Sequence, residues 1–349
     1  MSWFRRGHQN SKDSDDTPGS GDSHSQDSAK RELFLPGGVA DESVNSEGRG
    51  FFLLGGSQKT GKFYYVSIDE EGHAFIEIGG RRLMADAPDI LPKDEQEINR
   101  LDFQHFLLYH ALGGNYAAPI TQPGSILDVG CGTGRWAMEI AQTFPRANVI
   151  GLDIVTPVPS VEKPPENYLF MNGNVLEGLP FANASFDFVH MRLLFMAIPA
   201  NRWPFAVREL ARVTRPGGWI ELVEGGLPKN GGPALEALAR WANEASRQRG
   251  IDLHLGTQVG RFLHEAWMID IVNHDIKFPV GRYGGRIGQM AAVDTFAMIE
   301  SLRALVIMQG IAPAKRYDQE LANARSYVSQ SQAQCILPFY LAYGRRGHT

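Results

Sequence analysis

A glycine-rich run in the first half of the chain does most to restrict the possible folds. Ile126-Leu127-Asp128-Val129 is apolar apart from one acid, and Gly130-Cys131-Gly132-Thr133-Gly134 follows it directly. The pattern predicts a buried strand, a tight turn and the start of a helix. Glycine adopts positive φ angles at no steric cost and lets a ligand approach the backbone, so we expect a binding site at this turn.

The segments around this run alternate between strand and helix patterns. Strands joined through helices need crossover connections, which produce a parallel sheet. The sequence therefore predicts an α/β fold of the Rossmann-like kind. The predicted strands are 125–129, 148–153, 168–173, 186–190 and 219–223, and the predicted helices between them are 135–144 and 203–213.

The acid before the first glycine indicates what kind of ligand the turn holds. A dinucleotide site has the pattern G-x-G-x-x-G, because the helix N-terminus there holds a pyrophosphate. Gly130, Gly132 and Gly134 instead give G-x-G-x-G with Arg135 next, and Asp128 would repel a pyrophosphate. A carboxylate suits an ammonium group, as in the methionine part of S-adenosylmethionine. We therefore expect this cofactor, and a nicotinamide oxidoreductase is the disfavoured alternative.

Polar residues after the next two strands suit a nucleoside. Asp153 ends the second predicted strand, where a carboxylate can accept hydrogen bonds from both ribose hydroxyls. Nicotinamide enzymes use the same arrangement, so Asp153 supports a ribose without identifying the ligand. Asn174 follows the third strand and can pair with the adenine edge, and Val175 can supply a backbone donor.

The first ninety residues differ from this pattern. Residues 1–48 are rich in Ser, Asp, Gly and Gln, which is typical of a disordered tail. Residues 49–90 hold short aromatic and β-branched runs between glycine pairs, which predict a small β-rich extension. A helix is then expected from Asp94, an N-cap with Glu97 three residues later, to Gly113-Gly114.

Composition disfavours several classes of protein. The 349 residues carry a formal net charge of −5, which argues against nucleic acid as a partner. The two cysteines, Cys131 and Cys335, lie far apart, and His254 and His264 have no further ligand at metal spacing, so no metal site is expected. We expect neither a signal peptide nor a membrane partner, because no run approaches the ~20 apolar residues of a membrane helix. The expected location is the cytoplasm.

Four segments resemble the class I S-adenosylmethionine-dependent methyltransferases, and within them the LaeA-like (velvet-complex regulator) group and related bacterial methyltransferases. The resemblance spans about residues 88–228 and rests on 91–105 before the domain, the glycine motif at 126–134, and two later segments, 186–192 and 210–219. It implies a seven-stranded, mostly parallel sheet with helices on both faces and an antiparallel last strand. The sixth and seventh strands would be 269–280 and 335–343. The domain would cover 91–349, with a helical insertion at about 284–332 that forms a lid or a substrate wall.

The resemblance also implies that the helix before the glycine motif covers the cofactor. Arg100 on this helix would then lie near the cofactor carboxylate, and Arg192 would pair with that carboxylate, with the substrate or with a surface acid. Together these arguments predict a set of cofactor-binding residues. They are Arg100, His105, Asp128, Gly130, Cys131, Gly132, Thr133, Gly134, Asp153, Ile154, Asn174, Val175, Met191 and Arg192.

The catalytic chemistry has no fixed signature, because methyl transfer mainly needs a positioned nucleophile and the exclusion of water. His190 and Glu224 end the fourth and fifth strands and are the candidates for a general base; a packed histidine and a loop cap are the alternatives. Enzymes that methylate base amines or glutamine often carry Asn/Asp-Pro-Pro-aromatic after strand four, but His190-Met191-Arg192-Leu193 stands there. We expect methyl transfer to an O, N or C atom of a small molecule. The alternative is a cofactor-binding regulator that acts through protein contacts.

Overall fold

The structure is a computed structural model that describes residues 51–54, 64–69, 72–156, 163–330 and 332–348. The predicted disordered tail, 1–48, lies outside these residues. All described residues belong to one unit, 33–349.

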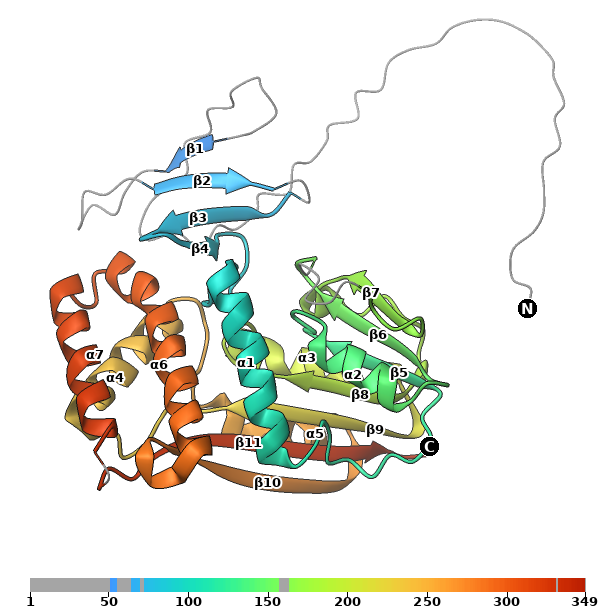
Figure 1. Cartoon of the computed structure of the whole chain (residues 1–349). Helices are drawn as coiled ribbons and strands as arrows, with labels where there is room; N and C mark the ends of the chain where they lie inside the picture. Colours follow the sequence, from blue (N-terminus) through green and yellow to red (C-terminus); the bar gives the residue numbers. More distant parts are fainter. Residues whose placement is uncertain (1–50, 55–63, 70–71, 157–162, 331, 349) are drawn as a thin grey trace, which may run out of the picture. The chain divides into compact units, whose positions relative to one another are not determined.

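A seven-stranded sheet carries the fold, in the order β10-β11-β9-β8-β5-β6-β7 (Figure 1). The strands from β7 to β9 are mutually parallel, and β11 runs antiparallel to both β9 and β10. The predicted seven-stranded sheet with an antiparallel last strand is therefore confirmed. The strands are β5 (Ser125–Val129), β6 (Asn148–Asp153), β7 (Tyr168–Asn172), β8 (Phe186–Arg192), β9 (Thr214–Gly225), β10 (Met268–Val280) and β11 (Cys335–Arg346).

Four strands are longer than predicted: β10 begins one residue earlier, β11 ends three residues later, and β9 and β8 also extend. The expected strand at 219–223 starts five residues earlier, at Thr214, although Pro216-Gly217-Gly218 predicts a turn. The register between β8 and β9 shifts between Phe186 and Phe188, so the extra residues form an irregularity inside the strand rather than a break. β8 likewise continues to Arg192, which carries His190 and Arg192 to the same edge of the sheet as Asp128.

Helices lie along the sheet and beside it. α2 packs on β5 and β6, and α3 and α5 pack on β9, while α4, α6 and α7 contact one another (Figure 1). The long helices are α2 (Arg135–Thr143), α3 (Trp203–Val213), α4 (Gly232–Arg247), α5 (Val259–Glu265), α6 (Gly285–Met308) and α7 (Ala314–Val328). The short 3₁₀ turns are η1 (Val175–Glu177), η2 (Ala200–Arg202), η3 (Leu255–Gln258) and η4 (Arg282–Gly284).

Helix α1 (Glu95–Leu112) precedes the sheet and contacts both α2 and α6. Its ends follow the predicted signals: the Asp94 carboxylate accepts a hydrogen bond from the Glu97 amide at 3.0 Å, and Gly113 closes the helix with a φ of 72°. Because α1 reaches both the glycine motif and the C-terminal helices, it connects two parts of the chain that the sequence separates.

A second sheet has four antiparallel strands in chain order. They are β1 (Phe51–Leu54), β2 (Tyr64–Ile68), β3 (Ala74–Ile78) and β4 (Arg81–Met84). Ile76 and Leu83 are fully buried, and Ile76 joins the same apolar core as Leu127 and Val189 of the large sheet. The division of the chain into a tail, an extension and a domain stays a prediction. Among the described residues, no helix combines the length and apolarity needed to span a membrane.

Candidate functional site

The glycine turn between β5 and α2 has the backbone that its sequence predicts. Gly130, Gly132 and Gly134 have φ angles of 69°, 54° and 75°. A Cβ atom on Gly130 would lie 2.6 Å from the Leu194 side chain, and one on Gly134 would lie 2.6 Å from the Tyr168 hydroxyl. Conformation and space therefore both require glycine at these two positions.

Helix α1 covers this turn. The Thr133 hydroxyl donates a hydrogen bond of 2.7 Å to the Asp102 carboxylate on α1. The neighbouring Cys131 is buried, and burial raises the pKa of its thiol far above the ordinary range. Cys131 is thus a small buried residue of the turn and has no thiolate for nucleophilic chemistry.

Asp153, at the end of β6, faces the glycine turn. One carboxylate oxygen accepts a hydrogen bond of 2.8 Å from the Gly132 amide, and the other accepts one of 3.2 Å from the Val155 amide. Burial raises the pKa of Asp153, and the Lys93 ammonium opposes that rise. Each oxygen still has a lone pair for a further donor.

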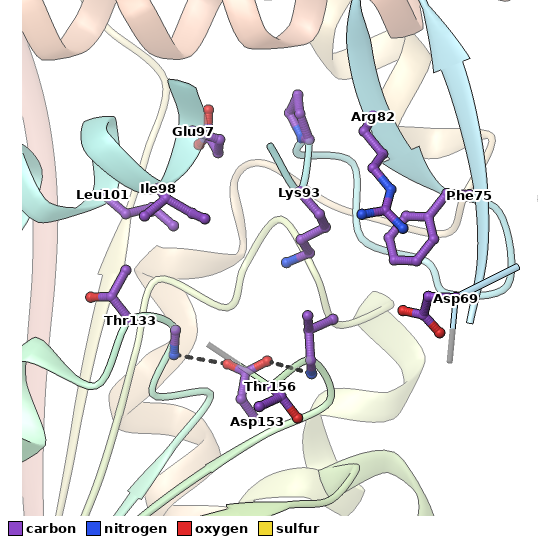
Figure 2. A pocket seen from close by; sticks show the side chains of 13 residues that line it. Asp69, Phe75, Arg82, Lys93, Glu97, Ile98, Leu101, Thr133, Asp153 and Thr156 are labelled. Carbon is purple, nitrogen blue, oxygen red and sulfur yellow. Dashed lines mark hydrogen bonds between the residues drawn. The ribbon is translucent and has the colours of Figure 1, made fainter. Parts of the chain in front are cut away.

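Three cavities lined by described residues lie around Asp153. The extension cavity, about 330 Å³, is bounded by the small sheet, α1 and the glycine turn. Figure 2 shows Lys93 pointing into it opposite Asp153, with Arg82 beside the ring of Phe75. The loop cavity lies over Asp128 and Gly130, and the Asn174 cavity lies between Ile154 and Val175; each is about 110 Å³. Lys93 and Asp153 line all three cavities.

Lys93 is a site residue that the sequence argument missed. Its ammonium forms an ion pair of 2.6 Å with Asp89. Burial lowers the pKa of Lys93, but the carboxylates of Asp89 and Asp153 outweigh this effect and raise it overall. Its position two residues before the helix of the resembling segment was the available signal. Lys93 keeps a positive charge at the point where the three cavities share their lining.

The side-chain amide of Asn174 forms hydrogen bonds with its own neighbours in the chain. Its side-chain oxygen accepts a hydrogen bond of 3.0 Å from the Leu176 amide, and its NH₂ group donates one of 3.0 Å to Glu177. These bonds make Asn174 the N-cap of η1. The predicted adenine contact of its side chain would have to replace or share them, whereas Ile154 and Val175 line the cavity with apolar surface.

Asp128 is paired with His190. The two lie opposite one another on β5 and β8, and Asp128 Oδ1 lies 2.8 Å from His190 Nδ1. Asp128 lines the loop cavity, whereas His190 is not among the residues that line the three cavities. The general-base role predicted for His190 therefore lacks the exposure that a base needs.

Arg192 and His105, both predicted to bind the cofactor, line the loop cavity and are in contact with each other. Arg192 Nη2 donates a hydrogen bond of 2.7 Å to His105 Nδ1, because a guanidinium has no acceptor. His105 Nε2 lies 3.0 Å from Glu139 and must carry the ring proton. Burial lowers the pKa of His105, and the charge of Arg192 lowers it further, which agrees with this neutral form.

Arg100 does not lie where it was predicted. Its guanidinium bonds to Glu97 at 2.7 Å and to Asp294 of α6 at 2.9 Å, and it is not among the residues lining the cavities. Two buried carboxylates therefore hold the Arg100 guanidinium away from the three cavities. Asp294 also accepts a hydrogen bond of 3.0 Å from Gln104, which does line the loop cavity.

Glu224 and Met191, predicted as a general base and a cofactor contact, are buried and do not line the three cavities. Glu224 is fully buried, and its two carboxylate oxygens accept hydrogen bonds from the amides of Leu194 and Phe195 at 3.1 and 3.0 Å. Burial raises the pKa of Glu224 to about 8. It caps the chain after β8, where Leu193 has a φ of 58°. Met191 is fully buried in the apolar core and does not line the cavities.

The loop cavity contains further residues that the sequence argument did not select. Arg135, at the start of α2, lines it together with Gln104 and Trp136. The charge of Arg135 directly after the last glycine was a usable signal, whereas Gln104 and Trp136 have patterns typical of packed helix residues. Among the described residues, no group of three His, Cys, Asp or Glu side chains is placed to hold a metal ion.

Comparison with known proteins gives a consistent result. Residues 126–218 match the family model described as a methyltransferase domain. The chain is 32% identical to the secondary metabolism regulator laeA of Aspergillus flavus over 77% of this chain and 75% of that protein. It is also 32% identical to the N-methyltransferase sirN of Leptosphaeria maculans, over 58% of this chain and 74% of that protein.

Two further similarities are more limited. The methyltransferase str2 of Strobilurus tenacellus is 38% identical over 38% of this chain, which spans about half of that protein, 47%. Among solved structures, phosphoethanolamine N-methyltransferase 2 of Haemonchus contortus is 17% identical with a TM-score of 0.44, covering 89% of this chain and 71% of that one.

Proposed function

The chain belongs to the LaeA-like group of class I S-adenosylmethionine-dependent methyltransferases, and from this premise we propose that it transfers the methyl group of S-adenosylmethionine to a small molecule. One observation carries the proposal: three cavities around the glycine turn share Asp153 and Lys93. An amino-acid end, a ribose and a base would each have a different chemical surface there.

The loop cavity suits the methionine end. Asp128 offers a carboxylate oxygen to the ammonium group, and Arg135 and Arg192 line the same cavity with positive charge for the carboxylate. This arrangement replaces the predicted role of Arg100, which is held by Glu97 and Asp294.

Asp153 and the Asn174 cavity suit the adenosine part of the cofactor. Asp153 would accept hydrogen bonds from the ribose hydroxyls while it keeps its bonds to the Gly132 and Val155 amides. The Asn174 cavity, between Ile154 and Val175, would hold the base. Leu194 fills the space that a Cβ atom at Gly130 would need, so this side chain packs directly against the backbone of the turn.

The protein's own residues mainly bind, orient and exclude water. When bound, S-adenosylmethionine supplies an electrophilic methyl group on a sulfonium centre. Leu193 and Leu194 line the loop cavity and form an apolar wall beside Asp128 and Gly130, and Glu224 fixes the Leu194 amide. This wall favours transfer to an aligned nucleophile over loss to water. The proposal assigns no proton transfer to His190 or Glu224, because both are buried outside the cavity lining.

The acceptor is proposed to be a small molecule methylated at an O, N or C atom. The relatives named methyltransferase and the absence of Asn/Asp-Pro-Pro-aromatic at 190–193 support this reading. Neither nucleic acid nor a membrane is part of the proposal, and the proposed location is the cytoplasm. Imaging of a fluorescent fusion in the source cells tests the location.

A second function has its own support. The relative matched over 77% of this chain is named a regulator of secondary metabolism, so a cofactor-binding regulator that acts through protein contacts is the other candidate. In that case the cofactor would bind, but no acceptor would be methylated.

Calorimetry and a labelled-extract assay separate the possibilities. We expect S-adenosylmethionine and S-adenosylhomocysteine to bind, and a methyl-labelled cofactor to yield a labelled small molecule from a host-cell extract. An Asp153→Asn variant serves as the control for non-enzymatic labelling. Binding without any labelled product favours the regulator, and no binding of either ligand excludes both candidates.

A further inference from the structure

The pair formed by Asp128 and His190 has a role that neither residue's predicted function explains. Both side chains are almost fully buried, with 3% of Asp128 and 1% of His190 exposed. They lie on adjacent parallel strands in direct register, and Oδ1 and Nδ1 are 2.8 Å apart. One oxygen of Asp128 is thereby fixed, and the carboxylate also lines the loop cavity.

The protonation of this pair follows from its partners. An ionised carboxylate only accepts hydrogen bonds, so Nδ1 of His190 carries the proton and donates it. Burial lowers the pKa of His190, and the bond to Asp128 offsets this only in part. His190 is thus a neutral imidazole whose Nδ1 proton points at Asp128.

The plane of the imidazole is fixed from α2. The ring of His190 stacks on Trp136 with the centroids 3.7 Å apart and the planes 7° apart. The Trp136 indole in turn donates a hydrogen bond of 2.6 Å to the Asn115 carbonyl. Since Trp136 follows the glycine turn by two residues, the same helix start sets both the turn and the direction of the His190 donor.

Two further charged residues lie near His190. Glu221 lies opposite His190 on β9; its Oε2 accepts hydrogen bonds from the Ala117 and Ala118 amides at 2.8 and 2.7 Å, and its Oε1 is buried without a hydrogen-bond partner. Arg192 is bonded to His105. Asp128 is therefore the hydrogen-bond partner that the structure gives to His190.

We infer that His190 is a positioning residue: it holds one oxygen of Asp128 so that the carboxylate presents its other oxygen to the ammonium group of the cofactor. The inference rests on the proposed function. Asp128 would contact only the amino-acid end of the cofactor. Loss of the His190 donor should therefore weaken the binding of ligands that have this end and leave the affinity for ligands without it unchanged.

Two substitutions separate the donor from the stacked ring. His190→Phe keeps a ring against Trp136 and removes the donor, and His190→Asn keeps an N–H at the Nδ1 position and removes the ring. The ligands are S-adenosylhomocysteine, which has the ammonium, and methylthioadenosine, which has the ribose and base but no amino-acid end. Calorimetry gives their Kd values, and thermal unfolding checks the fold of each variant.

We expect His190→Phe to raise the Kd for S-adenosylhomocysteine about tenfold to a hundredfold, the range for losing a hydrogen bond to a charged group. Methylthioadenosine should bind as it does to the original protein, and His190→Asn should regain most of the affinity for S-adenosylhomocysteine. Equal weakening of both ligands by His190→Phe, or His190→Asn as weak as His190→Phe, overturns the inference.

A measurement without substitution protects the test against misfolded variants. Nitrogen-15 NMR of the original protein should show His190 as the neutral tautomer with the proton on Nδ1. A proton on Nε2 alone overturns the inference. Failure of the original protein to bind either ligand rejects the proposed function instead, so the two failures are distinguishable.

Discussion

Arg100 on α1 donates a hydrogen bond of 2.9 Å to Asp294 on α6, a residue 194 positions further along the chain. Both side chains are buried, with 5% and 1% exposed. Arg100 also bonds to Glu97, and Asp294 also accepts from Gln104. This buried group of charges fastens the helix over the glycine turn to the C-terminal helices.

Removing Asp294 should destabilise the fold strongly. Asp294→Ala leaves the buried guanidinium of Arg100 with one carboxylate fewer, and breaking a buried pair costs about 3–5 kcal/mol. Urea unfolding measures the free energy. The control is Asp318→Ala, which breaks the ion pair between Asp318, 52% exposed, and Arg303, 36% exposed. This substitution should lower the free energy of unfolding by less than about 1 kcal/mol. Equal losses in the two variants would show that the buried pair contributes no more than a surface one.

Gly130→Ala tests the contact between the glycine turn and Leu194. Gly130 and Gly79 have similar φ angles, 69° and 58°, but a Cβ atom at Gly79 meets nothing within 4 Å. Both substitutions share the cost of positive φ, so Gly79→Ala is the matched control. We expect Gly130→Ala to lose about 1–3 kcal/mol more than the control because of overpacking, and to lose S-adenosylhomocysteine binding. Unfolding and calorimetry measure both effects; identical stability in the two variants contradicts the contact.

Asp153→Asn should weaken cofactor binding, because Asp153 is proposed to hold the ribose. The substitution removes the charge and leaves one acceptor oxygen, while the Gly132 and Val155 amides and two ribose hydroxyls need four acceptor sites. We expect Kd for S-adenosylhomocysteine to rise about tenfold to a hundredfold. Asp270→Asn, on the exposed pair with Arg345, should leave Kd unchanged. A normal Kd for the Asp153 variant would remove the ribose from the proposal.

Glu224 should make stability depend on pH. Burial raises its pKa from 4.5 to about 8, so the folded state holds a proton that the unfolded state has lost between these values. The contribution is fully present below pH 4.5 and is lost as pH rises toward 8, with a slope of up to about 1.4 kcal/mol per pH unit. Urea unfolding across this range should show a flatter slope for Glu224→Gln.

The control for Glu224 has the opposite sign. Hydrogen bonds from Arg212 lower the pKa of Glu209, so its contribution is present above its ordinary pKa and is lost only in more acid solution. Glu209→Gln should therefore leave the slope between pH 5 and pH 8 unchanged. A Glu224→Gln variant with the original slope would assign the pH dependence to another group, with Glu221, whose pKa burial raises to about 7, as the next candidate.

Local patterns in the sequence were sufficient for the turn and the sheet. The glycine pattern predicts positive φ angles at Gly130, Gly132 and Gly134, because no other residue type adopts them as easily. Asp153 could be predicted as a site residue because it ends a strand beside that turn. The Asp94 and Gly113 caps of α1 were likewise readable, since capping involves residues within one turn.

The partners of charged side chains were not readable in this way. The sequence predicts a cofactor contact for Arg100, because one of its two actual partners, Asp294, stands on a helix whose packing no local pattern reveals. The sequence suggests His190 and Glu224 as bases because they end strands at the expected edge. In the structure, His190 is hydrogen-bonded to Asp128, and Glu224 accepts hydrogen bonds from the Leu194 and Phe195 amides. Lys93 stands just before the helix that the pattern identifies, but nothing local to it indicates that its side chain reaches Asp153.

Helix α1 has attachments at both faces: Asp102 holds Thr133 of the glycine turn, and Arg100 holds Asp294 of α6. A displacement of α6 is therefore expected to move α1 and, with it, the proposed cofactor site at the turn. Thermodynamic linkage makes this coupling work in both directions. Cofactor binding at the turn should then slow hydrogen exchange in α6.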